Sequence, residues 1–226
     1  MDKKRIDILA DEYQDRYNTV LRRVWPTMGG NGFNEHNQTV NYLLAYEIIA
    51  KENNEQITTW YEFQIPNEND KKKRNNRIDG MIINHTKKEI LLVEAKRFCY
   101  NDVEKKRRDV GEDVIRIEEL DMSTRMEGVF YSESDNKSDY SVYGVVLFDL
   151  WTENEIEKAA CSRWKRICDK VQTEDVISFL RIRDDEVNEV KGLRECVGAT
   201  QREVTCKRWE NEAYSYFLNT LVWKKQ

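Results

Sequence analysis

Two short apolar segments carry charged residues in places where a buried strand does not tolerate unpaired charge. Residues 77–83 contain Asp79, and residues 90–96 end in Glu94-Ala95-Lys96. Charge in an apolar strand is costly unless it is paired or bound to a metal ion. Mg²⁺ prefers hard oxygen ligands, keeps several waters and contacts phosphate directly. These residue types therefore indicate metal-assisted cleavage of a phosphodiester bond.

Each residue has a distinct expected role in that chemistry. Asp79 and Glu94 would be metal ligands, with the backbone carbonyl of Ala95 as a third ligand. The metal would polarise the scissile phosphate and lower the pKa of a bound water. The ammonium of Lys96 would orient that water and stabilise the developing negative charge. The alternative is a half-buried salt bridge between Lys96 and the two acids.

The geometry of a hairpin supports the first interpretation. Both segments are short and β-branched, which is typical of strands, and residues 84–88 between them have the composition of a turn. A turn centred between Thr86 and Lys87 places Asp79 opposite Glu94. Directly opposed side chains have Cβ atoms about 5 Å apart. Lys96 follows Glu94 by two residues and shares its face. A slip of one residue would break this arrangement.

An Asp, a hairpin-length gap and Glu-X-Lys closing an apolar strand resemble the PD-(D/E)XK nuclease superfamily, which has the restriction-endonuclease-like fold. The matching residues are Asp79, Glu94 and Lys96, and Ile78 replaces the proline that often precedes the Asp. The resemblance covers about residues 35–150. It implies a core of a helix, a three-stranded antiparallel meander, a helix and a strand. It also implies Mg²⁺ as cofactor, for which Mn²⁺ is expected to substitute.

The predicted elements follow that order. Residues 35–52 show helical periodicity, with Glu47 inside the apolar stripe, and Glu47 fits the extra acid that the superfamily often takes from its first helix. A solvated Glu at the helix edge is the equal alternative. The other predicted core elements are a strand over 57–65, a helix over 103–122 and a buried strand over 142–150. The first of these strands carries Glu62, which is a weaker candidate for the site.

The flanking segments extend this core. Residues 2–25 predict an amphipathic helix that ends at Pro26, and residues 152–155 resemble a capping box that opens another helix. Residues 176–182 suggest a strand, and the aromatic stretch 209–223 suggests a helix or strand packed on the core. The fold class is thus α/β, a mixed central sheet flanked by helices, in a single domain over 1–226 with a C-terminal α/β extension from 151.

Two basic runs are expected at the same end of the sheet as the proposed site. One lies between the first two core strands and the other opens the helix after Lys96; they comprise Lys71, Lys72, Lys73 and Arg74, and Lys105, Lys106, Arg107 and Arg108. Basic side chains there would hold phosphates beside the cleaved bond. Ordinary solvated charge is the alternative. The net charge of −5 argues against a protein that coats DNA, but not against a nuclease with a local basic rim.

Composition and motifs indicate the cellular compartment and argue against several kinds of site. The five cysteines include no C-x-x-C pair, so neither a disulfide scaffold nor a zinc site is indicated. No segment reads as a signal peptide or a membrane span, and a reducing cytoplasm is the natural compartment. There is no G-x-S-x-G motif for serine chemistry.

Together these features predict a Mg²⁺-dependent endonuclease that cuts double-stranded DNA, of the type II restriction class and homodimeric as is common in the superfamily. A structure-specific or RNA-directed nuclease in defence or repair is the alternative within the class. A nuclease-like fold used only for binding nucleic acid is the alternative outside it.

Overall fold

The computed structural model describes residues 1–21, 34–65, 76–98, 102–120, 140–152, 154–209 and 212–225. A six-stranded mixed sheet runs through them in the order β1-β2-β3-β4-β6-β5. Neighbouring strands are antiparallel except β3 and β4, which are parallel. The strands are β1 (Ile57–Ile65), β2 (Asn76–Asn84), β3 (Glu89–Lys96), β4 (Ser141–Trp151), β5 (Cys196–Trp209) and β6 (Glu212–Lys224).

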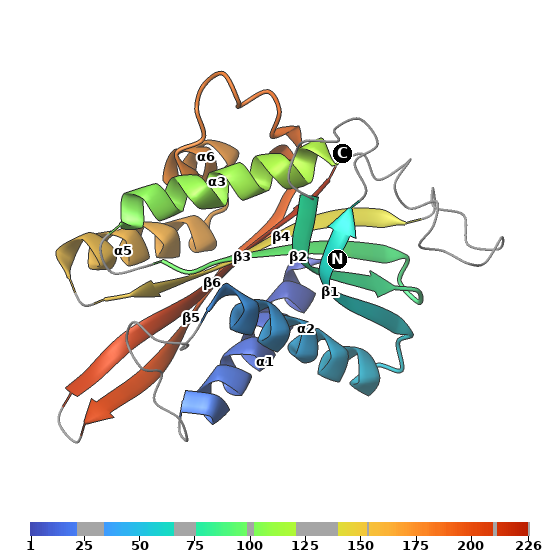
Figure 1. The fold of residues 1–226 in the computed structure, drawn as a ribbon, viewed down its shortest axis with the longest axis horizontal. Helices are drawn as coiled ribbons and strands as arrows, with labels where there is room; N and C mark the ends of the chain where they lie inside the picture. Colours follow the sequence, from blue (N-terminus) through green and yellow to red (C-terminus); the bar gives the residue numbers. More distant parts are fainter. Residues whose placement is uncertain are drawn as a thin grey trace.

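Helices cover both faces of this sheet (Figure 1). One face packs against α1 (Lys3–Leu21) and α2 (Glu35–Glu52), and the other against α3 (Val103–Glu119), α5 (Glu155–Asp169) and α6 (Thr173–Leu180). A short 3₁₀ helix, η2 (Lys191–Glu195), precedes β5. Because both faces are buried, β3 and β4 are almost continuously apolar rather than alternating, as expected for strands inside a covered sheet.

The predicted α/β class, with a mixed sheet flanked by helices, is confirmed. The helix over 35–52 and the strand over 57–65 have the predicted bounds, and the strands at 77–83, 90–96 and 142–150 are each slightly longer than predicted. The helix α3 is the crossover between parallel β3 and β4. The predicted ends of the first helix and of the crossover helix, with Pro26, lie outside the described residues.

Two local predictions were wrong. Residues 176–182, predicted as a strand, lie mostly in α6, whose first turn carries acidic Glu174 and Asp175 and whose C-cap Arg181 is left-handed. A short apolar run does not separate a strand from a buried helix, and the acidic first turn was the overlooked signal. The capping box of α5 also starts later than predicted. Asn154 is the N-cap and exchanges hydrogen bonds with Glu157.

The C-terminal residues form a long hairpin, β5–β6, which joins the sheet through β6 against β4. The aromatic stretch 209–223 therefore lies largely in a strand. Trp223 and Tyr216 are fully buried, on opposite faces of the sheet.

A cluster of buried tyrosines ties α1 and α2 to the sheet. Tyr13 packs edge-on against Tyr17 and Tyr42, with ring centroids 5.1 and 5.6 Å apart, and Tyr17 stacks on Tyr216 at 6.2 Å. The Tyr216 hydroxyl donates to Oδ2 of Asp149 (2.8 Å), a fully buried acid of β4. The backbone N–H of Phe98 donates to the other oxygen, Oδ1, at 2.7 Å.

The buried acid makes stability depend on pH. Burial raises the pKa of Asp149 to about 7, whereas an unfolded Asp titrates at about 3.9. The folded chain therefore binds this proton more tightly, and the stability it contributes is present below about pH 4 and is lost as the pH rises to about 7. Asp149→Asn cannot ionise but keeps an acceptor for Phe98. Its stability relative to wild type should therefore rise between pH 5 and pH 8, by a few kcal/mol in order of magnitude. Urea unfolding at the two pH values measures this.

The exposed Asp184 provides the matched control. Asp184→Asn should show the same stability difference from wild type at both pH values. An Asp149→Asn variant whose difference from wild type is also independent of pH would contradict the assignment of Asp149 as a buried titrating group.

Candidate active site

The hairpin has the predicted register. Gly80 pairs with Val93, Met81 with Leu92 and Ile83 with Ile90, and the turn occupies residues 85–88. Asp79 is the next residue beyond this ladder and lies across from Glu94. Its Oδ2 accepts a hydrogen bond from the backbone N–H of Ala95 at 2.9 Å. The predicted register is confirmed as far as the pair Gly80–Val93, and the contact with Ala95 brings the Asp79 carboxylate to the residue after Glu94.

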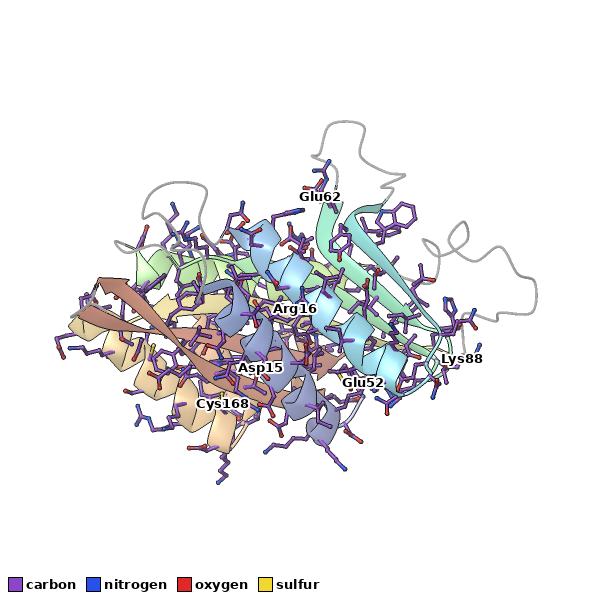
Figure 2. The ribbon with its side chains drawn as sticks, turned by 90° about the horizontal axis from the view of Figure 1, so that it is seen from below. Asp15, Arg16, Glu52, Glu62, Lys88 and Cys168 are labelled. Carbon is purple, nitrogen blue, oxygen red and sulfur yellow. The ribbon has the colours of Figure 1, made fainter. Side chains whose placement is uncertain are left out.

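The site lies at the end of the meander opposite the β2–β3 turn. Glu62 of β1 lies across from Asp79, between the pairs that join Tyr61 to Gly80 and Phe63 to Ile78. In Figure 2 Glu62 therefore marks the end of the sheet that carries the site, and Lys88 marks the turn at the other end.

Glu94 is the deepest charge of the site, with 1% of its side chain exposed. Burial, together with the carboxylates of Asp79 and Asp113, raises the pKa of Glu94 well above its ordinary value, while Arg116 opposes that rise. The guanidinium Nη2 of Arg116 lies 2.5 Å from Glu94 Oε1. The acid thus depends on a cation from the neighbouring helix α3.

Lys96 points to the same helix. Its Nζ lies 3.2 Å from Oδ2 of Asp113 and 4.0 Å from Oε2 of Glu35. Burial works against the charged form of Lys96, but the carboxylates of Asp113 and Glu35 outweigh it and raise the pKa. Lys96 is therefore a cation at neutral pH, held between Asp113 and Glu35.

Four residues of this cluster were missed in the sequence. They are Glu35 and Gln38 of α2 and Asp113 and Arg116 of α3. The side-chain amide of Gln38, fully buried, donates to the carbonyl of Lys96 at 3.2 Å, and Oε1 of Glu35 accepts from the N–H of Arg97 at 3.2 Å. Both contacts fix the end of β3.

A sequence signal for Asp113 did exist. It lies between Val110 and Val114 in the apolar stripe of the crossover helix, and it is buried. Burial raises its pKa to about 6, although Lys96 and Arg116 both act in the opposite direction. Like Glu47, Asp113 is an acid within an apolar stripe, and such an acid needs a partner.

The structure places Glu47 away from this cluster. Its Oε1 accepts a hydrogen bond from the Thr59 hydroxyl at 2.6 Å, and Thr59 pairs with Ile82, three residues along β2 from Asp79. Three residues of strand span about 10 Å. Glu62 is exposed and forms an ion pair with Arg77, 3.0 Å apart. Of the acids on the preceding helix, Glu35 rather than Glu47 reaches Lys96.

The second basic run divides into buried and exposed side chains. Arg107 is buried: its Nε donates to the carbonyl of Phe179 at 2.5 Å and its guanidinium lies over the Phe179 ring. This corrects the prediction that Arg107 faces nucleic acid. Lys105 and Arg108 are exposed, and Lys106 forms an ion pair with Asp109. The first run, residues 71–74, lies outside the described residues.

The donors suit a divalent cation, but they are held by cations of the protein itself. Four carboxyl groups and two cations meet here, so the cluster carries a net charge of −2 when all are ionised. Hard oxygen donors with excess negative charge are what Mg²⁺ requires. Within the described ranges, however, no three acidic, histidine or cysteine side chains converge as a ready metal site. Arg116 lies between Glu94 and Asp113.

No protein-family model, curated protein or solved structure matches the chain. Evidence on function therefore comes from the chain's own residues. None of the described helices has an apolar stretch long enough to cross a bilayer.

The two adjacent arginines of α3 allow a test of the structural assignment. Arg107→Ala removes buried hydrogen bonds to α6 and should lower the free energy of unfolding by about 1–3 kcal/mol. Arg108→Ala should change it by no more than about 0.5 kcal/mol, because Arg108 is exposed. Chemical denaturation measures both. Equal losses in the two variants would contradict the buried role of Arg107.

Proposed function

We propose that the chain is a Mg²⁺-dependent endonuclease that hydrolyses phosphodiester bonds of double-stranded DNA, in the manner of a type II restriction endonuclease of the PD-(D/E)XK superfamily. One observation carries the proposal. The β2–β3 hairpin brings Asp79 beside Glu94, on the face where Lys96 is held protonated. Cutting both strands of a duplex at one site calls for two active sites, which favours a homodimer.

Asp79, Glu94 and Asp113 would supply the hard oxygens, with the Ala95 carbonyl as a further ligand. Within a strand, the N–H and C=O of one residue leave on the same side. Because the Ala95 N–H meets Asp79, its carbonyl also faces that acid. Mg²⁺ bound to these groups would supply charge neutralisation at the phosphate and a water of lowered pKa.

The protein's own residues would orient the reacting groups. Lys96 is fixed by Asp113 and Glu35, so its ammonium has a defined position at the end of β3. A fixed ammonium beside the scissile phosphate stabilises the negative charge that grows as water attacks. Gln38 and Glu35 hold the backbone on either side of Lys96, which keeps that charge in place.

Plasmid cleavage tests this proposal. Supercoiled plasmid incubated with the protein and Mg²⁺ should be nicked or linearised, and EDTA should stop the reaction. Asp79→Ala and Lys96→Ala should each lower the cleavage rate by about 10²-fold or more, because each removes charge stabilisation at the reacting phosphate. Gel electrophoresis against time gives the rates, and circular dichroism checks that the variants fold.

Two exposed residues serve as matched controls, Asp184→Ala for the acid and Lys170→Ala for the cation. Both should cleave at the wild-type rate. Cleavage that persists in Asp79→Ala and Lys96→Ala would overturn the site. A wild type that binds DNA without cutting any tested sequence would favour the binding-only alternative.

A second candidate function is a nuclease for unpaired strands, either structure-specific or RNA-directed, in defence or repair. The observation that favours it is Trp60, which is 55% exposed on the edge strand β1. Trp60 pairs with Met81, which is buried on the α3 side of the sheet, so Trp60 lies on the same face as the site. Met81, the partner of Trp60, lies two residues along β2 from Asp79.

The backbone beside Trp60 strengthens this reading. Glu62 has a φ of 51°, an unusual value for a non-glycine residue, and it interrupts the strand's alternation. Phe63 consequently packs edge-on against Trp60, with ring centroids 6.2 Å apart. An exposed indole braced by a second ring is a suitable platform for stacking one unpaired base.

Binding in EDTA distinguishes the two candidates without requiring cleavage. Trp60→Ala should weaken binding to a fluorescent single-stranded oligonucleotide by about 5- to 100-fold, since base stacking on an aromatic ring contributes about 1–3 kcal/mol. Trp60→Phe, the matched control, should retain most of the affinity. Fluorescence anisotropy with the corresponding duplex completes the test. Equal binding by all three proteins would exclude the stacking role.

A further inference from the structure

We infer that Arg116 is an internal counter-ion that occupies the place of the divalent cation, and that it must leave Glu94 and Asp113 before metal binds. The inference rests on the proposed function, because it takes the cluster to be a metal site. It concerns a residue of the crossover helix that the sequence did not single out.

The first support is geometric. A single nitrogen, Nη2 of Arg116, lies 2.5 Å from Oε1 of Glu94 and 2.9 Å from Oδ1 of Asp113. It therefore bridges carboxylates from two different elements, β3 and α3. A metal ion bound by the same two oxygens would lie between them, in the region that the guanidinium fills. The two cations cannot be present together in these positions.

The second support is the contrast in burial. The carboxylates of Glu94 and Asp113 are 1% and 7% exposed, whereas the side chain of Arg116 is 36% exposed. Only the arginine has an open side toward which it can move. Its Nε is buried and makes no hydrogen bond within the described part of the chain, so leaving the site would break no hydrogen bond of this atom. The acids are fixed, and the cation is exchangeable.

The third support is the chemistry of arginine. A guanidinium does not lose its proton in a protein, so it cannot yield its place by becoming neutral. An ionised Glu94 is therefore freed only when Arg116 is displaced. Lys96 differs, because it contacts Asp113 through the other oxygen, Oδ2, and it also reaches Glu35. Lys96 can keep both partners while Arg116 is replaced.

Arg116 also explains why the buried Glu94 is tolerated in the metal-free protein, because it supplies the opposite charge that a metal ion would otherwise provide. Removing Arg116 alone would leave Glu94 without a counter-charge, which is strongly destabilising. With all four acids ionised, the cluster carries −2 when Arg116 is present and −1 when a divalent cation replaces Arg116. Metal binding would therefore relieve charge rather than add to it.

The test measures Mn²⁺ binding to the protein without nucleic acid, by titration calorimetry or by the electron paramagnetic resonance signal of free Mn²⁺. Arg116→Gln removes the competing charge and should bind Mn²⁺ about tenfold tighter than wild type, or more, since close charges in a protein interact by several kcal/mol. Arg116→Lys keeps a cation and should lie near wild type. Arg166→Gln, an exposed arginine of α5, is the matched control and should equal wild type.

Thermal unfolding gives a second readout in case Arg116→Gln is too unstable to titrate. Mn²⁺ should raise its Tm by more than it raises that of wild type, because the ion replaces the missing counter-charge. Adding Glu94→Gln to this variant should abolish the gain. Weaker or unchanged Mn²⁺ binding by Arg116→Gln, or an equal Tm shift in all variants, would overturn the inference.

The Mn²⁺-binding test and the DNA-cleavage test can fail independently of each other. Tighter Mn²⁺ binding by Arg116→Gln with no cleavage of any nucleic acid would sustain the exchange and sink the nuclease. DNA cleavage by wild type, together with Mn²⁺ binding that is unchanged in Arg116→Gln, would sustain the nuclease and sink the exchange.

Discussion

A negative charge buried at the end of β3 is the constraint on which the rest of this site depends. Glu94 occupies a strand covered on both faces, where neighbouring positions are filled by apolar side chains. Such a charge needs a partner of opposite sign close by. Lys96 of the same strand pairs with Asp113 and Glu35 instead, and Arg116 of α3 provides the partner of Glu94. The crossover helix is consequently held to β3 by an ion pair as well as by the packing of Val110, Val114 and Ile117.

The strand positions of the acids could be predicted from the sequence, but the residues of α3 that pair with Glu94 and Lys96 could not. The pairing of Asp79 with Glu94 follows from a local feature, the turn at residues 85–88, and a local turn sets the register of its own hairpin. The contact between Lys96 and Asp113 depends on a feature that is not local to the hairpin. It requires that the crossover helix α3 be rotated about its axis so that Asp113 faces the end of β3. Strand periodicity contains no information on that rotation, and the apolar stripe of α3 shows that Asp113 is buried without showing which residue it pairs with. Asp113 and Arg116 were therefore missed although both lie in a correctly predicted helix.

The predicted roles of Arg107 and Glu47 differ from their observed positions for a similar reason. Arg107 and Arg108 are neighbours in a run of four basic residues, and composition treats them alike. In the helix their side chains point about 100° apart. One packs under Phe179 of α6, a segment predicted as a strand, while the other remains exposed. The error in α6 thus concealed the partner that buries Arg107. Position along the helix has a similar consequence in α2. Glu35, in the first turn, reaches the end of β3, whereas Glu47 lies further along and contacts Thr59 of β1.

A purely structural salt bridge is the main rival explanation of the cluster, and its charge balance argues against it. Lys96 and Arg116 suffice for two acids, yet four are linked in this network: Glu94 and Asp113 pair with the cations directly, Glu35 reaches Lys96 at 4.0 Å, and Asp79 accepts from the Ala95 N–H. Excess acids raise one another's pKa, as Asp79 and Asp113 do for Glu94, and that repulsion costs stability. A network needed only for packing would be more stable with fewer carboxylates. The surplus has a use if a further cation binds, and a divalent ion at this end of the sheet would supply it.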